Sequence, residues 1–268
     1  MSRDRRYALE LDPREVERYR MMAEQARAAE SDLWELAGIG PGARVGDVGC
    51  GPGALLPALS AEVGPGGLVR AVDADADAVA AARSLAAAAG LANVTVAQGR
   101  ADHTGIEEGS LDAAMLRHVL AHNGGAEDAI VAHLATLVRP GGCVYLVDVD
   151  GTAMRTLPEH ADLTDLGERY AAFRAARGDD NRAGLRLADR LARAGLELLE
   201  FRGRYMIGQP PPTVRPPSWA AREAMVTAGV ATEEDVRRWD RAFAELEAAP
   251  VRPTIFAPIF AAVGRRPA

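Results

Sequence analysis

Three glycines at alternate positions follow a short β-branched run that carries one acid, Asp47. Glycine allows positive φ angles and a close approach of the backbone to a ligand, and apolar runs that end in glycine are typical of buried strands. A helical pattern follows from residue 54, and the free N–H groups of a first helical turn can face the same ligand. The segment therefore predicts a strand, a tight ligand-binding loop and a helix. Because Gly49, Gly51 and Ala54 also fit the dinucleotide fingerprint G-x-G-x-x-G/A, the loop alone is compatible with any adenine nucleotide.

A second acid, Asp73, ends the next apolar run, which covers residues 68–72. It lies roughly 20 residues beyond the glycine loop, a spacing at which a carboxylate can accept hydrogen bonds from both hydroxyls of a ribose. The alternative is a helix-capping role, because Asp75 and Asp77 open the alanine-rich helical pattern that follows. We expect Asp73 to bind a ribose.

Two histidines, His118 and His122, are spaced i, i+4, so that a helix would place both imidazoles on one face. A neutral imidazole can act as a general base for a hydroxyl or an amine, or it can be hydrogen-bonded within the scaffold. Two histidines on one face can also bind a metal, but no H-E-x-x-H motif or nearby third ligand is evident. We therefore predict catalytic roles for both histidines and no metal.

Strand-like runs alternate with helical patterns along the chain as far as residue 150, which predicts a doubly wound α/β sheet. Strands are expected over 44–48, 68–73, 94–98, 109–116 and 143–150, with helices over 13–37, 54–63, 75–89 and 128–138. Beyond residue 150 we expect helices over 162–176 and 181–194, a sixth strand over 196–207, helices that begin at Ser218 and Thr232, and a seventh strand over 254–263.

The composition is that of an ordinary soluble globular protein: 268 residues, 48% hydrophobic, 26% charged and a net charge of −7. There is no basic cluster with interleaved aromatic residues, so we expect no nucleic-acid partner. The charged N-terminus has no apolar signal segment, and no apolar run approaches the roughly 20 residues of a membrane helix. Cys50 and Cys143 lack metal-type spacing and suit a reducing compartment. We expect a cytoplasmic protein without a membrane partner, and a homodimer is left open.

The glycine loop and its acid, Asp47-x-Gly49-x-Gly51-x-Gly53, resemble the first motif of the class I methyltransferases that depend on S-adenosylmethionine (SAM). Gly-Ser-Leu-Asp at 109–112 is similar to the start of the fourth strand of that family. Leu-Val-Arg-Pro-Gly-Gly at 137–142 is similar to the turn before its fifth strand, and a dinucleotide-binding domain has no need of this turn. The resemblance is strongest over residues 33–150. It points to the ubiquinone-biosynthesis-type and natural-product small-molecule subgroup.

The resemblance implies a seven-stranded sheet with an antiparallel last strand, and SAM at the carboxyl ends of strands one to four. It places the methionine part of SAM near the glycine loop and Arg117, and the ribose at Asp73. Arg100 stands where the family has an acid for the adenine, so either Arg100 stacks on the ring or Asp102, with Ala101, makes the contact; we favour Asp102. The cofactor residues so predicted are Asp47, Gly49, Cys50, Gly51, Gly53, Asp73, Ala74, Ala101, Asp102 and Arg117.

Segments outside the core are expected to cover the substrate. We divide the chain into an N-terminal helical cap (1–40), a SAM-binding core (41–150), and a part (151–268) that holds the closing strands and the helical lids. The lids are inserted after strand five and between strands six and seven, the second behind a proline-rich stretch over 209–217. Packing of the lid helices on one another is the alternative for their aromatic residues. The predicted substrate residues are Tyr19, Met22, Tyr170, Trp219 and Arg222.

These features predict a SAM-dependent methyltransferase that transfers a methyl group to a small-molecule acceptor in secondary metabolism. One alternative is a SAM-binding enzyme with a non-methylating reaction, such as a cyclase or decarboxylase, because it would keep every cofactor motif. A second is an NAD(P)-dependent oxidoreductase, which fits Gly49, Gly51, Ala54 and Asp73. The second is disfavoured because no Tyr-x-x-x-Lys motif is evident and the chain contains no lysine.

Overall fold

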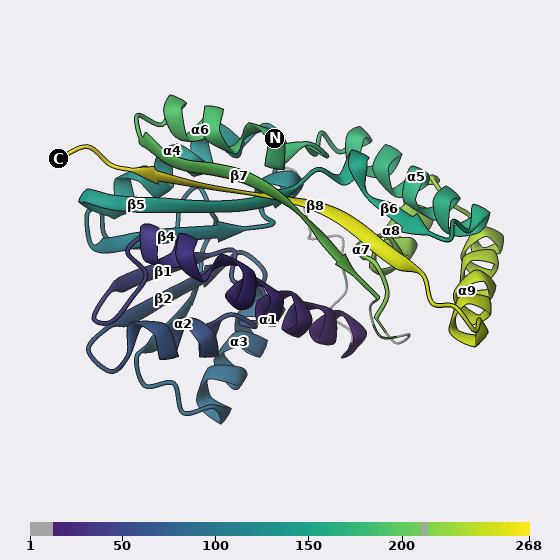
Figure 1. The fold of residues 1–268 in the computed structure, drawn as a ribbon, viewed down its shortest axis with the longest axis horizontal. Helices are drawn as coiled ribbons and strands as arrows, with labels where there is room; N and C mark the ends of the chain where they lie inside the picture. Colours follow the sequence, from purple (N-terminus) through teal and green to yellow (C-terminus); the bar gives the residue numbers. More distant parts are fainter. Residues whose placement is uncertain (1–12, 210, 212–213) are drawn as a thin grey trace.

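A mixed β-sheet runs through the molecule and carries helices on both faces (Figure 1). The structure is a computed structural model that describes residues 13–209, 211 and 214–268, so residues 1–12 of the predicted cap and part of the proline-rich stretch lie outside the described residues. Within the described residues the sheet has eight strands in the order β3-β2-β1-β4-β5-β8-β6, and β7 pairs with β8 off this path. The predicted doubly wound α/β architecture is confirmed.

Five parallel strands form the half of the sheet that carries the predicted site. Val45 and Val48 in β1 are fully buried, because parallel strands covered by helices on both faces need apolar side chains on both sides. Val48 pairs with Val72 on one side and with Leu116 on the other, so the carboxyl ends of three strands come together. The five strands are β1 (Arg44–Val48), β2 (Leu68–Asp73), β3 (Val94–Gln98), β4 (Leu111–Arg117) and β5 (Val138–Val149).

Separate hydrophobic clusters fill the two faces of the sheet. On one face, Trp34 of α1 and Leu56 of α2 belong to the same cluster as Met115 of β4. On the other face, Ile130 of α4 belongs to a cluster with Leu116, the next residue of β4, as the alternation of side chains along a strand requires. The first face carries α1 (Pro13–Leu36), α2 (Leu56–Val63) and α3 (Ala76–Ala88), and the second carries α4 (Glu127–Leu137) and α6 (Leu187–Arg193).

Two long antiparallel strands, β7 (Glu197–Gly208) and β8 (Thr254–Arg265), close the sheet. β8 lies between β5 and β7 and is antiparallel to both, as the resemblance implied for the last strand. The expected number of seven strands was one too few, because β6 (Arg155–Leu157) pairs with the start of β8. β6 follows the short turn η2 (Gly151–Ala153) and continues the pairing of β5 along the same edge. Three residues are too few to show strand alternation in the sequence.

The Arg-Pro-Gly-Gly segment forms the start of β5 rather than a turn before it. The pairing of β4 with β5 is interrupted there by a register shift, and Gly141 has a φ of 75°. A Cβ atom on Gly142 would lie 2.8 Å from the carbonyl oxygen of Asp112, so only glycine fits. Nε of Arg139 donates to the Asp112 carboxylate at 2.7 Å. The motif therefore builds a bulge that joins β5 to β4.

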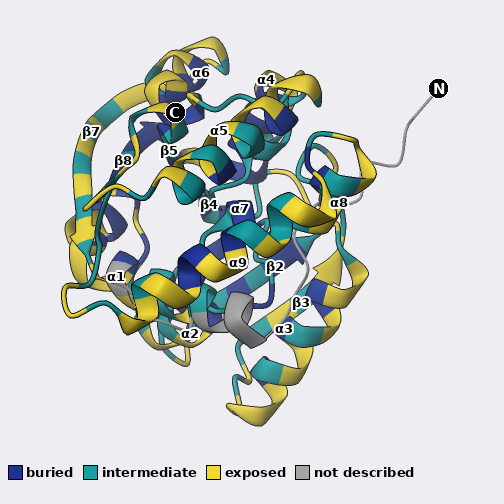
Figure 2. Ribbon diagram, turned by 90° about the vertical axis from the view of Figure 1, so that its right-hand side faces the viewer, coloured by how far each residue is buried: buried dark blue, intermediate teal, exposed yellow. Residues whose placement is uncertain are grey.

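Four helices, which we call the lid helices after the predicted lids, share a hydrophobic cluster of their own at the end of the molecule where β5 ends and β8 begins (Figure 1). Figure 2, which looks onto this end, shows buried, intermediate and exposed residues alternating along α9 and α5. Thr232 and Asp235 form a complete capping box at the start of α9. The predicted helix over 181–194 is divided into η3 (Ala183–Arg186) and α6. The lid helices are α5 (Ala161–Ala176), α7 (Pro217–Ala220), α8 (Arg222–Thr227) and α9 (Glu233–Ala248).

No helix in the described part of the chain is both long enough and apolar enough to cross a bilayer.

Candidate functional site

The glycine loop lies between β1 and α2 and is tied to the end of β2. The N–H groups of Gly49 and Cys50 both donate to the carbonyl oxygen of Val72, at 2.7 and 3.1 Å. Gly49 has a φ of 73°, and a Cβ atom there would lie 2.3 Å from a methyl carbon of Val119. Gly53 has a φ of 85° and is similarly crowded by α2 and α3. The loop therefore needs its glycines both for backbone conformation and for space.

Asp73 stands at the end of β2 and organises the loop beside it. Its Oδ2 atom accepts a hydrogen bond from the Gly51 N–H at 2.8 Å, and its Oδ1 atom accepts one from the Asp75 N–H at 2.9 Å. Burial raises the pKa of the Asp73 carboxyl despite these bonds. Asp75, not Asp73, caps α3, because its side chain accepts from the N–H groups of Asp77 and Ala78. The helix-capping alternative for Asp73 is therefore not what the structure shows.

Asp47 is a buried carboxylate within β1, only 3% exposed. Its Oδ2 atom has no hydrogen-bond partner among the described residues. Burial raises the pKa of Asp47 to about 7, the nearby charge of Arg117 lowers it, and that of Asp73 raises it further. A buried carboxylate oxygen without a donor is unfavourable, so this atom is suited to receive a donor from a ligand.

Glu30 is a second buried carboxylate, and it fastens α1 to three strands. Both terminal nitrogens of Arg117, at the end of β4, donate to it. The hydroxyl of Tyr145 on β5 donates to it at 2.5 Å, and Nη2 of Arg204 on β7 donates at 3.0 Å. Arg117 thus lies at the expected end of β4, but its guanidinium group is engaged by Glu30 rather than directed at the glycine loop.

Sequence reasoning missed Glu30, although a signal for it exists. Ala26, Glu30, Leu33 and Ala37 recur at helical spacing, and all four are buried. A charged residue among small and apolar ones on such a stripe indicates a paired, buried group, because an unpaired charge would not be tolerated there.

His118 and His122 do not share a helical face, so that part of the prediction is wrong. His118 has a φ of 55°, and it is the one non-glycine residue at positive φ among the described residues. This conformation stops any helix, and only the three-residue turn η1 (Leu120–His122) follows. The N–H of His118 donates to the carbonyl oxygen of Val147 at 2.8 Å, which holds the strained residue against β5.

Both histidines are neutral at physiological pH. Burial lowers the pKa of His118 well below its usual range, and the charges of Arg117 and Arg18 lower it further. Burial, together with the charges of Arg174 and Arg18, lowers the pKa of His122 to about 3. Each imidazole therefore keeps one N–H donor and one acceptor nitrogen.

Two side chains that the sequence did not single out hold the turn between the histidines. Oδ2 of Asp148, near the end of β5, accepts from the N–H of Ala121 at 3.0 Å. Arg174 of the lid helix α5 donates to the carbonyl oxygen of the same residue. Burial raises the pKa of Asp148 to about 6. The lid and the core therefore both position η1.

The helix α1 lies over the glycine loop and brings Tyr19 to it. Cε1 of the Tyr19 ring is 3.7 Å from the position that a Cβ atom on Gly51 would take. The guanidinium group of Arg18 lies 4.9 Å from the centre of that ring, and its Nη1 donates to the sulfur of Met22 at 3.0 Å. The structure therefore brings Tyr19 to the loop, with Met22 one helical turn farther along α1.

The residues predicted to contact the adenine follow β3. Nε and Nη2 of Arg100 donate to the two carboxylate oxygens of Asp102 at 2.9 and 2.8 Å. This pairing holds the pKa of Asp102 below its usual range. The carbonyl oxygen of Ala74, at the end of β2, accepts from Nε2 of Gln98 at 3.0 Å. The two alternatives for the adenine, Arg100 and Asp102, are therefore partners of each other.

Trp219 lies within the hydrophobic cluster of the lid helices and Arg222 lies against its ring, which is the packing alternative that the sequence left open for the aromatic residues. The ring of Trp219 meets Phe243 edge-on at 5.3 Å. Nη1 of Arg222 donates to the carbonyl oxygen of Trp219 at 3.1 Å, and its guanidinium group lies 4.9 Å from the ring centre. Tyr170 packs at the border of this cluster, 5.6 Å from the guanidinium group of Arg174.

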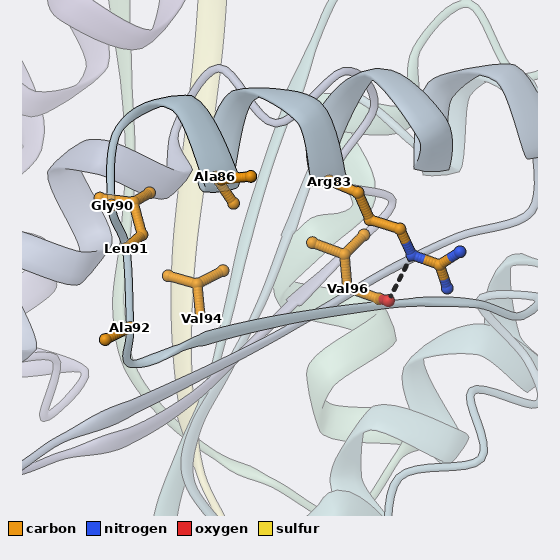
Figure 3. A pocket seen from close by; sticks show the side chains of 8 residues that line it. Arg83, Ala86, Gly90, Leu91, Ala92, Val94 and Val96 are labelled. Atoms are coloured by element: carbon orange, nitrogen blue, oxygen red, sulfur yellow. Dashed lines mark hydrogen bonds between the residues drawn. The ribbon is translucent and has the colours of Figure 1, made fainter.

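No group of three or more histidine, cysteine, aspartate or glutamate side chains in the described ranges could hold a metal ion. A groove of about 460 Å³ lies elsewhere, between α3 and β3 at the edge of the sheet (Figure 3). Its lining is mostly alanine, leucine and valine, and Arg83 closes one side by donating to the carbonyl oxygen of Val96 at 3.0 Å. The groove has no group suited to chemistry, so the glycine loop and η1 are the candidate site.

Comparison with known proteins shows the family of this chain. A family model described as a methyltransferase domain matches residues 45–142, which span β1 to the bulge of β5. The chain is 30% identical over 167 residues to a ubiquinone biosynthesis O-methyltransferase of Burkholderia pseudomallei, an alignment that covers 61% of this chain and 68% of that protein. It is 32% identical over 125 residues to an uncharacterized 37.1 kDa protein in a transposon of Streptomyces fradiae, covering 47% of this chain but only 35% of that protein.

Solved structures share the fold. A putative methyltransferase from Bacillus halodurans has a TM-score of 0.59 at 19% identity, over 90% of this chain and 100% of that one. The [4+2]-cyclase SpnF has a TM-score of 0.57 at 18% identity, over 90% of this chain and 81% of that one. The chain belongs to the class I SAM-dependent methyltransferases. The predicted family, enzyme class and cofactor are thereby confirmed.

Proposed function

We propose that this enzyme transfers the methyl group of SAM to a small-molecule acceptor in secondary metabolism, in the cytoplasm and without a nucleic-acid partner. The observation that carries the cofactor's placement is the unpaired, buried Oδ2 atom of Asp47 beside the glycine loop. The ammonium group of the methionine part of SAM supplies the cationic donor that this oxygen lacks. The relative named for ubiquinone biosynthesis supports hydroxyl compounds as the first acceptors to test.

The remaining cofactor contacts follow the strand ends. Asp73 would accept the ribose hydroxyls, because each carboxylate oxygen keeps a free acceptor position beside its one backbone donor. Ala101 and Asp102 would meet the adenine, with Arg100 fixing the carboxylate. Arg117 would act through its charge, since Glu30 holds its terminal nitrogens. The loop residues that would lie against the methionine part are Gly49, Cys50, Gly51 and Gly53, and Ala74 would lie beside the ribose.

When bound, SAM supplies a methyl carbon already activated by the positive sulfonium. The protein then has to align the lone pair of the acceptor with that carbon and exclude water. His118 and His122 are poor proton acceptors at neutral pH because their pKa values are low. We therefore assign them to hydrogen bonds that orient the acceptor. Tyr19 and Met22 from α1, and Tyr170 from the lid, would close the site from the other side.

Calorimetry with S-adenosylhomocysteine (SAH), the product left by methyl transfer, tests the cofactor site. Wild type should bind SAH, and Asp73→Ala should weaken binding by roughly 2 kcal/mol or more, about thirtyfold. An unchanged affinity would refute the ribose assignment. Preferential binding of a nicotinamide dinucleotide would instead support the oxidoreductase alternative.

Turnover with a panel of phenols, amines and carbon acids tests the reaction. A methyltransferase releases one SAH for each methylated product. A product formed without SAH release would favour the non-methylating alternative.

A further inference from the structure

Glu30 and Asp47 are two buried carboxylates that share one guanidinium neighbour, Arg117, but only one of them is paired with it. Arg117 donates twice to Glu30. Its charge also lowers the pKa of Asp47, so the two groups lie within electrostatic range. Yet no ion pair joins Arg117 to Asp47 in the described part of the chain, and Oδ2 of Asp47 has no partner.

The register of the sheet places Arg117 where it could reach Asp47. Asp47 in β1 pairs with Met115 in β4. Met115 packs in the hydrophobic cluster that includes α1. Arg117 follows Met115 by two residues, so its side chain leaves β4 on the same face of the sheet as that of Met115. The separation is one strand spacing across and about two residues along, which an arginine side chain can bridge. Glu30 on α1 is the group that draws the guanidinium away.

A paired Asp47 could not serve the cofactor well. An arginine donating to Oδ2 would occupy the acceptor that the ligand's ammonium needs, and it would place a like charge beside that ammonium. With the guanidinium held by Glu30, its positive charge still favours the ionised form of Asp47 from a distance, while the oxygen stays open.

We propose that Glu30 is a positioning residue for cofactor binding, which holds Arg117 away from Asp47 and so keeps the Oδ2 atom of Asp47 available to the cofactor's ammonium. This inference rests on the proposed role of Asp47. It also gives α1 a part in the cofactor site, because Glu30 can act only while α1 is seated on the sheet.

Other charged and titratable groups surround this cluster. Tyr145 from β5 and Arg204 from β7 both donate to Glu30. Asp73 from β2 faces Asp47 and raises its pKa, and the pKa of Cys50 is itself raised by burial and by the charges of both acids. Burial lowers the pKa of His118 and keeps it neutral, and the charges of Arg117 and of Arg18 from α1 lower that pKa further. Arg117 is the cation that lowers the pKa of Asp47.

SAH binding measured by calorimetry from pH 5.5 to 8.5 tests the proposal on the full chain. Glu30→Gln frees Arg117, so we expect SAH affinity at pH 8.5 to fall at least about tenfold, and the midpoint of its pH dependence to move to lower pH. Adding Arg117→Gln to Glu30→Gln should recover most of the loss, because the released cation is then gone. Arg204→Gln is the matched control. It weakens the same cluster but leaves the pair of Glu30 with Arg117 intact, so SAH affinity should stay within about twofold.

Several outcomes would overturn the proposal. Glu30→Gln could bind SAH as wild type does, the double variant could stay as weak as Glu30→Gln, or Arg204→Gln could lose as much affinity as Glu30→Gln. The last result would mean that the cluster only stabilises the fold. Should Glu30→Gln not fold, Arg117→Gln alone decides, since Glu30 keeps Arg204 and Tyr145 as partners. Its pH midpoint should move upward, and an unmoved midpoint refutes the proposal. If the wild-type protein itself did not bind SAH, the proposed function would be refuted instead.

Discussion

We expect Asp47→Asn to lower the affinity of this enzyme for the cofactor without lowering its stability. The carboxyl of Asp47 is buried, and burial raises its pKa from the usual 3.8 to about 7. At 1.36 kcal/mol per pKa unit, ionising this group in the folded protein is unfavourable by roughly 4 kcal/mol relative to water. Because the raised pKa means that the folded state binds the proton more tightly, this side chain lowers stability progressively as pH rises from about 4 to 7.

The affinity for a cationic ligand has the opposite pH dependence, because it should rise with pH. The ammonium of SAH binds the ionised carboxylate, so below pH 7 its affinity should fall by up to about tenfold for each pH unit, and above pH 7 it should level off. Asp47→Asn cannot ionise. Its SAH affinity should therefore be lower at pH 8 by roughly 1.5–3 kcal/mol, the worth of a charged hydrogen bond, and should change little with pH.

Two measurements check this reasoning. Calorimetric titration of SAH between pH 5.5 and 8.5 should show the pH dependence in wild type and a flat profile in Asp47→Asn. Chemical denaturation at pH 8 without ligand should show the variant to be at least as stable as wild type. A flat wild-type profile would refute the electrostatic argument, and so would a variant several kcal/mol less stable than wild type.

Substitutions at three further positions have expected results of their own. His118 has a left-handed backbone conformation that glycine adopts without strain, so His118→Gly should raise the free energy of unfolding by about 1 kcal/mol, whereas His118→Ala should not. If urea denaturation showed the alanine variant to be more stable than the glycine variant, the strain argument would be wrong. Tyr19→Ala uncovers Gly51 and should weaken SAH binding severalfold in calorimetry, and an unchanged affinity would mean that α1 does not contact the cofactor. Thr232→Ala breaks the capping box of α9 and should lower the free energy of unfolding by about 1 kcal/mol without affecting SAH binding; a loss of binding would show that the lid reaches the cofactor.

The parallel core was predictable because its boundaries are marked by residues with few other uses. Gly49 follows β1 and Asp73 ends β2, and valine recurs in both strands, as is typical of strands buried between helices. The same pattern predicted that Asp73 lies beside the glycine loop, and in the structure it accepts a hydrogen bond from the Gly51 N–H. The capping box of α9 was visible for a similar reason, since Thr232 and Asp235 stand three residues apart before an amphipathic pattern.

What the sequence could not reveal depends on tertiary contacts. The positive φ of His118 is imposed by the end of β4 and the bond to Val147, so a local pattern suggested a helix instead. The resemblance assigned Arg117 to the cofactor, and its pairing with Glu30 was missed because Glu30 lies 87 residues away in the chain. Trp219 resembles a substrate residue until the lid cluster that buries it is known.

The arrangement of β8 has a consequence for how the enzyme is made. β8 is the last strand in the chain, yet it lies inside the sheet and pairs with β5, β6 and β7. While a ribosome is still producing the lid helices, the backbone groups along the outer edge of β5 have no strand to pair with. Such an edge can pair with a wrong strand. The vulnerable period thus ends only when residues 254–265 become available, so late synthesis, rather than the native state, is the stage at which this fold is most exposed to aggregation.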